Sequence, residues 1–88
     1  MIDRVLQLNS KLRYLSRQVI FGGPDDEILE ELRDLFRELY EEIGRPDRLK
    51  ILEESLEVDL RVGLKYALSN LTEDIAEFLY REIMKLSP

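Results

Sequence analysis

The chain has 88 residues, 44% of them hydrophobic and 36% charged, a balance that favours one small globular domain over residues 1–88. It has no Cys, His or Trp, which excludes disulfides, zinc fingers, thiolate metal sites and catalytic Ser–His or Cys–His pairs. Its net charge of −6 argues against nucleic-acid binding, and its apolar runs are too short to span a membrane.

The first predicted helix covers about Asp3 to Phe21. Its apolar residues follow a 4-3-4-3-4 spacing, the seam of a left-handed helix pack: Met1, Val5, Leu8, Leu12, Leu15 and Val19. Residues 1–22 are basic and residues 23–60 are acidic, so we expect this helix to lie beside the next one. A basic helix that binds an acidic partner is the less favoured alternative.

The second predicted helix runs from Pro24 to Ile43, with proline at its first position and acidic residues following it. Gly22-Gly23 stops the preceding helix, and Gly44 is expected to end this one in a left-handed conformation. Tyr40 lies at the margin of the apolar stripe. The stripe itself contains Ile28, Leu29, Leu32, Leu35, Phe36, Leu39 and Ile43.

The third predicted helix, from Pro46 to Ser69, is apolar over roughly two-thirds of its circumference. One stripe contains Leu49, Leu52, Leu56, Leu60, Leu64 and Ala67. A second stripe lies nearly opposite and contains Ile51, Val58, Val62 and Tyr66. Gly63 lies between them, and glycine inside a helix usually marks a place where another helix crosses closely.

The width of this apolar surface has a consequence for assembly. In a simple bundle each helix meets two neighbours and needs an apolar arc of only about 100–140°. We therefore expect the second stripe to form an interface with a second copy of the chain, most simply a two-fold dimer. The alternative is that this helix is the central helix of a monomer.

The third joint is predicted at residues 69–72, with Asn70 as the left-handed stop and Thr72 as the N-cap of a fourth helix. This helix would run from about Glu73 to Leu86. Its inward residues would be Ile75, Ala76, Leu79, Ile83 and Leu86. Because all three joints are short, neighbouring helices should be antiparallel, and the sequence predicts an all-α, compact antiparallel four-helix bundle.

Two of the joints share the pattern Gly-Xaa-Pro-Asp, at residues 22–25 and 44–47. Together with the segment PDDEILEELRDLFRELYEEIG and the missing Cys, His and Trp, this pattern resembles computationally designed helical bundles over residues 22–57. Residues outside that range are less regular, and proteins of hyperthermophiles share the Leu/Glu/Arg bias, so a natural thermophile origin is the alternative. Design would imply a thermostable scaffold, assembly or binder, and no particular activity.

Four polar residues lie in or beside the apolar stripes: Asn9, Ser16, Ser55 and Asp59. They predict a buried hydrogen-bond network that would specify helix register. The alternative is that they lie at the edges of the stripes and contact water. Asp59 and Glu82 could also be read as an acid–base pair, but paired acids on helices are usually salt-bridge partners.

The sequence predicts no catalytic residue, cofactor or metal ion, since it has neither an EF-hand loop nor a glycine-rich phosphate loop. It also predicts no membrane or nucleic-acid partner. We expect a non-enzymatic, soluble protein, intracellular if natural and recombinant if designed, that acts as a structural scaffold and self-associates through its third helix. The second hypothesis is a helical binding module that captures a partner helix or an acidic surface.

Overall fold

The computed structural model describes residues 2–23 and 25–86, and its regular elements are all α-helices. They are α1 (Ile2–Gly22), α2 (Asp26–Ile43), α3 (Pro46–Val58) and α4 (Leu60–Leu86). The all-α class and the four helices predicted from the sequence are confirmed. Among the described residues, no helix combines the length and apolar character that crossing a membrane requires.

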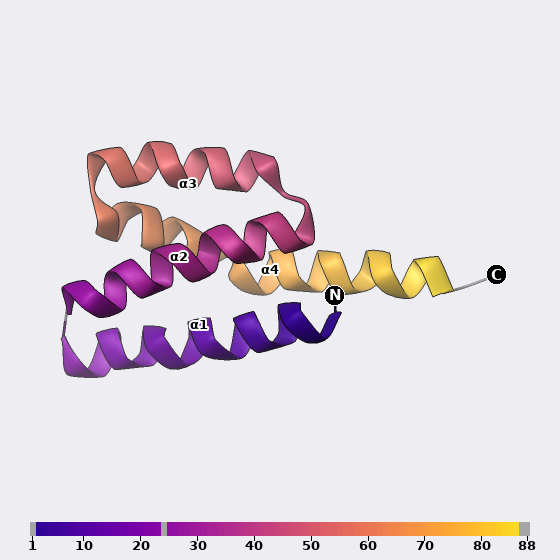
Figure 1. The fold of residues 1–88 in the computed structure, drawn as a ribbon, viewed down its shortest axis with the longest axis horizontal. Helices are drawn as coiled ribbons and strands as arrows, with labels where there is room; N and C mark the ends of the chain where they lie inside the picture. The colour runs from indigo at the N-terminus through magenta and orange to yellow at the C-terminus, as the bar shows by residue number, and fades with distance from the viewer. Residues whose placement is uncertain (1, 24, 87–88) are drawn as a thin grey trace.

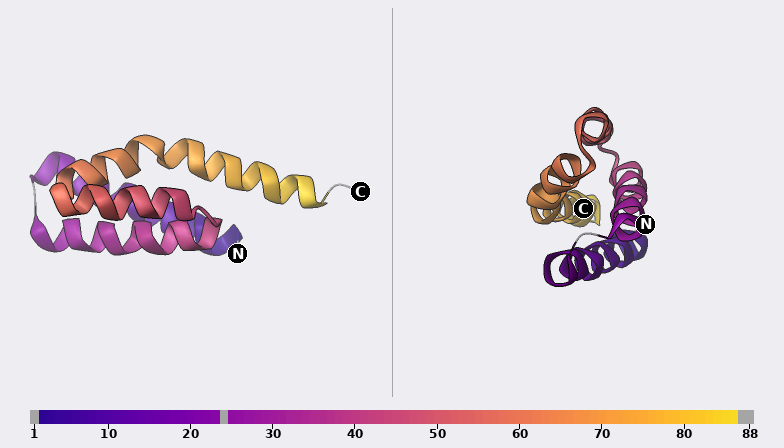
Figure 2. Two further views of the ribbon diagram at one scale, coloured as in Figure 1. Left: turned by 90° about the horizontal axis from the view of Figure 1, so that it is seen from above. Right: turned by 90° about the vertical axis from the view of Figure 1, so that its left-hand side faces the viewer.

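The helices reverse direction at each short joint, so that α2 and α4 lie between α1 and α3 (Figures 1 and 2). Within the described residues, α1 contacts α2 and α4 but not α3. The molecule measures 47 × 25 × 17 Å along its principal axes. Much of this length comes from α4, whose C-terminal turns continue past the ends of the other helices (Figure 1). Those last turns have few neighbours within the chain.

The core is built from the predicted stripes, and its residues come from all four helices. They are Val5, Leu8, Leu12 and Leu15 of α1, Leu29, Leu32, Leu35, Phe36, Leu39, Tyr40 and Ile43 of α2, Leu52 of α3, and Leu64, Ala67, Leu71, Ile75 and Phe78 of α4. The prediction placed Tyr40 at the margin, whereas it is 1% exposed. Its ring packs 5.9 Å from that of Phe36, which makes it part of the core.

The joint between α1 and α2 differs slightly from the prediction. The helix α2 begins at Asp26, because Asp25 takes an extended conformation and its carboxylate accepts hydrogen bonds from the N–H groups of Glu27 and Ile28. Pro24, the predicted first residue, lies outside the described residues, as does Met1. At the other end, Gly44 has a φ of 69° and ends α2 in the predicted left-handed conformation.

The largest correction concerns the predicted helix from Pro46 to Ser69. It is two helices, because Asp59 is extended and ends α3, and α4 starts at Leu60. The predicted stop at Asn70 and the N-cap at Thr72 lie inside α4. Leu71 explains why the helix continues, since it is 2% exposed and extends the buried stripe of Leu64 and Ala67. That packing outweighs a weak stop signal that includes neither Gly nor Pro.

The inward face of α4 also differs from the prediction. Its buried residues follow a 3-4-4-3 spacing: Leu64, Ala67, Leu71, Ile75 and Phe78. This register buries Ile75 as expected but leaves Ala76 exposed on the flank. Ile83 and Leu86 are exposed for another reason, since they lie in the turns that extend beyond the bundle (Figure 1).

Candidate functional site

The joint between α3 and α4 consists of one residue, Asp59, and its polar groups serve both helices. Its N–H donates to the carbonyl of Ser55 at 3.0 Å and so closes the last turn of α3. Its carboxylate accepts from the N–H of Arg61 at 2.8 Å, and its carbonyl accepts from Gly63 at 3.2 Å. Aspartate suits this place because its short acidic side chain caps the positive end of α4.

Gly63 makes the tight joint sterically possible. A Cβ atom at this position would lie 2.9 Å from Cδ2 and 3.3 Å from the backbone nitrogen of Leu56. The predicted close approach of another helix at Gly63 is therefore confirmed. The approaching helix is α3, which the sequence analysis had joined to α4 as one continuous helix.

The predicted interface stripe is divided between the two helices. Ile51 and Val58 lie on α3 and are 41% and 82% exposed, whereas Val62 lies on α4 and is 53% exposed. Tyr66 is only half-buried, and its hydroxyl accepts a hydrogen bond of 2.7 Å from Arg48. The wide apolar circumference that suggested an interface belongs to a folded hairpin, so any interface must now be argued from these exposed side chains.

The predicted polar network is not formed among the described residues. Of its four members only Ser16 is buried, and its hydroxyl donates to the carbonyl of Leu12 in its own helix. Asn9 is half-buried and accepts from Arg13, Ser55 is half-buried, and Asp59 is exposed at the joint. The alternative reading, polar residues at the edges of the stripes, describes three of the four positions.

The possible acid–base pair of Asp59 and Glu82 is not brought together. Asp59 precedes α4 and Glu82 lies near its C-terminal end, so they are about 35 Å apart at 1.5 Å per residue. Glu82 instead pairs with Lys85 at 3.0 Å. These carboxylates cannot act on one substrate atom within a single chain.

A buried ionic cluster that the sequence analysis missed links the start of α3 to the middle of α4. Its centre is Asp74, which is 1% exposed. The carboxylate oxygen Oδ1 accepts from Nη1 of Arg45 at 3.4 Å and from Nε of Arg48 at 3.2 Å. Arg45 also forms a two-pronged pair with Asp47 and reaches Glu77 at 3.1 Å. These contacts attach the N-terminal end of α3 to α4.

Burial and charge act against each other in this cluster. Burial raises the pKa of Asp74 above its usual range, although the guanidinium groups of Arg48 and Arg45 pull it down. The hydrogen bonds from Arg45 lower the pKa of the exposed Asp47 to about 2. Burial, together with the charge of Asp74, also raises the pKa of Tyr40. Two buried polar atoms, the Tyr40 hydroxyl and Oδ2 of Asp74, have no hydrogen-bond partner.

One sequence signal could have identified Asp74. It lies three residues after Leu71 and four before Phe78, a spacing that places it on the buried face of a continuous helix. The predicted start near Glu73 hid this pattern, because it put Asp74 in a first turn, where acidic residues are common.

Asp74 makes stability depend on pH with a definite sign. Because its pKa is raised in the folded state, the folded protein takes up a proton more readily than the unfolded chain as pH falls towards the ordinary value of 3.8. We expect the free energy of unfolding of the wild type, relative to Asp74→Asn, to be larger at about pH 4 than at about pH 7. Urea unfolding at both pH values measures this difference.

Asp47 supplies a control of opposite sign. Its pKa is lowered, so the stability that it contributes is lost as pH falls from 3.8 towards about 2. The advantage of the wild type over Asp47→Asn should therefore shrink in that interval. If the advantage over Asp74→Asn also shrinks on acidification, the ion pairs outweigh burial at Asp74 and the assignment is wrong.

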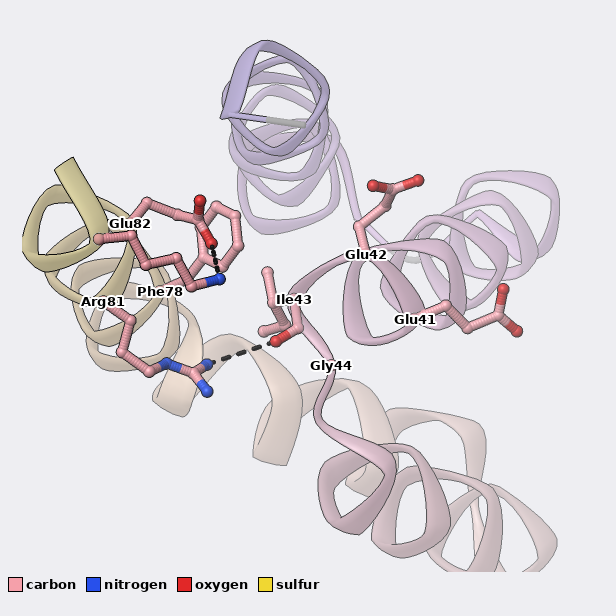
Figure 3. Close-up of a pocket in the computed structure, with 8 residues that line it drawn as sticks. Glu41, Glu42, Ile43, Gly44, Phe78, Arg81 and Glu82 are labelled. Atoms are coloured by element: carbon pink, nitrogen blue, oxygen red, sulfur yellow. Dashed lines mark hydrogen bonds and ion pairs between the residues drawn. The ribbon is translucent and has the colours of Figure 1, made fainter.

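The projecting end of α4 has an exposed apolar surface, here called the α4 tail patch: Tyr80, Ile83, Met84 and Leu86. At its base is a cavity of about 280 Å³ between α4 and the end of α2 (Figure 3). Arg81 donates to the carbonyl of Ile43 at 3.3 Å across this cavity and holds the tail against the end of α2. Figure 3 shows the side chains of Glu41 and Glu42 pointing away from Arg81.

A second, apolar cavity of about 230 Å³ lies between α1, α2 and the start of α4. Apolar side chains form most of its wall: Val19, Ile20, Leu29, Leu32, Leu64 and Leu68. Arg61 and Lys65 also line it. It is an apolar depression with a basic border.

Comparison with known proteins adds no relative to this description. The chain matches no protein-family model, no curated protein and no solved structure.

Proposed function

We propose that this protein is a structural scaffold, an antiparallel four-helix bundle of the designed type, that self-associates through apolar surface on α3 and α4. The observation that carries the proposal is the exposure of large apolar side chains in two groups on this helix pair. One is the α4 tail patch, and the other is the joint patch of Ile51, Val58 and Val62. Contiguous exposed apolar surface usually marks a site of protein–protein contact.

The ionic cluster supports a structural role instead of a catalytic one. Each charged group around Asp74 faces an opposite charge from another part of the chain, and the pairs connect the start of α3 with α4. A second cross-helix pair, Arg4 with Glu38, connects α1 with α2. Charges arranged in this way fasten helices to one another.

Static light scattering tests self-association. The wild type is expected to have about twice the chain mass of 10.4 kDa at high micromolar concentration. The double variant Val58→Glu/Val62→Arg places charges in the joint patch and should shift the mass towards that of a single chain, because an unpaired buried charge strongly disfavours an interface.

A matched control separates the patch from a general effect of charge. Lys50→Glu/Glu54→Arg changes two exposed residues of α3 at the same spacing and also leaves the net charge unchanged. It should retain the wild-type mass. A wild type that is monomeric at high micromolar concentration would contradict the proposal.

One observation favours the second candidate function, a helical binding module. The apolar cavity bordered by Arg61 and Lys65 offers complementary contacts to an amphipathic helix with acidic flanks. This candidate gains support if the isolated chain is monomeric and an acidic amphipathic peptide binds with an affinity that Arg61→Glu/Lys65→Glu reduces at least tenfold.

A further inference from the structure

The joint at Asp59 is a hinge of one residue inside a sequence with continuous helical periodicity. The buried stripe keeps its spacing through the joint, from Leu52 and Leu56 to Leu60 and Leu64. Residues 58–60 contain neither Gly nor Pro, unlike the joints at residues 22–25 and 44–47. The local sequence therefore favours a continuous helix, and the fold bends it by means of the Asp59 cap and the space left by Gly63.

Straightening the joint would restore interactions that the bend removes. A break in a helix leaves terminal N–H and C=O groups without helical partners, and here one carboxylate caps the N–H of Arg61. In a straight helix the i to i−4 ladder would run through Asp59. The contact of Gly63 with Leu56, which admits no Cβ atom, would also be released.

Straightening also aligns the joint patch. In the bent chain, Val58 and Val62 are exposed on two different helices. In a continuous helix, Ile51, Ser55, Val58 and Val62 follow a 4-3-4 spacing, which is the seam of a coiled coil. Such a seam would face the same seam of a second copy and remove these valines from water.

The contacts that a straight helix loses within its own chain have a ready replacement. In the bent chain α3 packs on α4 through Leu52, the Arg48–Tyr66 hydrogen bond and the pairs of Arg45 and Arg48 with Asp74. A second copy presents the identical surfaces, so all these contacts can form again between chains. Exchange of identical elements at a short hinge is a common, low-cost route to a dimer.

We propose that α3 and α4 straighten about Asp59 into one helix over residues 46–86, and that two copies exchange their α4 helices. The occupant of the exposed α3 surface is thus the α4 of a second copy. This inference rests on the proposed self-association and assigns its mechanism. The straight helix would be about 60 Å long, longer than the 47 Å of the bent chain.

Spin labels at Lys50 and Glu73 distinguish the two forms. Both positions are exposed, and the chain has no cysteine, so two introduced cysteines are labelled uniquely. In the bent chain the labels are on packed neighbouring helices and should be within roughly 20 Å. In a straight helix they are about 35 Å apart. Dilution with unlabelled protein restricts electron–electron resonance to distances within one chain.

We expect the dimer fraction to give the long distance and the monomer fraction the short one. Asp59→Leu removes the cap of α4 and favours a continuous helix, so it should increase both the dimer and the long distance. Three residues, Gly-Ser-Gly, inserted after Asp59 relieve the short hinge and break the helical period. That variant should be monomeric with the short distance.

Asp25→Leu is the matched control, because Asp25 caps α2 as Asp59 caps α4 but follows two glycines that prevent a continuous helix. It should lower stability without producing the long distance. A dimer fraction that gives only the short distance overturns the exchange and leaves self-association standing. If wild type and Asp59→Leu are both monomeric with the short distance, the exchange and the proposed function both fail.

Discussion

Leu52→Ala is expected to lower the free energy of unfolding by about 2–5 kcal/mol, the range for removing a fully buried leucine side chain. Leu52 is 0% exposed and is the only residue of α3 that is fully buried among those described. The loss is large for this chain, because a domain of this size has a total stability of roughly 4–13 kcal/mol. Urea unfolding followed by circular dichroism measures the change.

Ile51→Ala provides the control for Leu52→Ala. Ile51 is the preceding residue, is equally aliphatic, and is 41% exposed on the outer side of α3. Its truncation should cost less than about 1 kcal/mol when the protein is measured dilute enough to be monomeric, since surface substitutions seldom cost more. Equal costs for the two variants would mean that α3 is not held on the bundle through Leu52.

Gly63→Leu is expected to destabilise the bent chain by about 1–3 kcal/mol through overpacking against α3. Leucine would improve the helical propensity of α4, but its Cβ atom would meet Leu56 Cδ2 at 2.9 Å. The Leu56 side chain can move aside, whereas its backbone nitrogen at 3.3 Å can move only if α3 shifts. Urea unfolding at a concentration where the protein is monomeric measures this cost.

Gly22→Leu is the control for this substitution. Gly22 is also helical, and an added Cβ atom there would meet nothing within 4 Å. The same change of residue should therefore leave stability unchanged or raise it slightly. If Gly63→Leu behaves like Gly22→Leu, the close approach of α3 and α4 is not a constraint on the fold.

The sequence by itself determined the elements whose signals are local. The 4-3 spacing of Val5, Leu8 and Leu12 is enough to define the buried face of α1. Gly44 and Pro46 are enough to end α2 and start α3, since few residues adopt a positive φ and proline suits the first turn of a helix. These choices depend on residues within a few positions of one another.

Only the tertiary structure decided where the second half of the chain turns. Asp59 and Asn70 are both able to end a helix, and local propensity favoured Asn70. Breaking the chain at Asp59 allows Leu52 and Leu71 to be buried on the same core, and it places Asp74 within reach of Arg45 and Arg48. These contacts join residues that are far apart in the chain, and their combined free energy outweighs the local preference for a continuous helix.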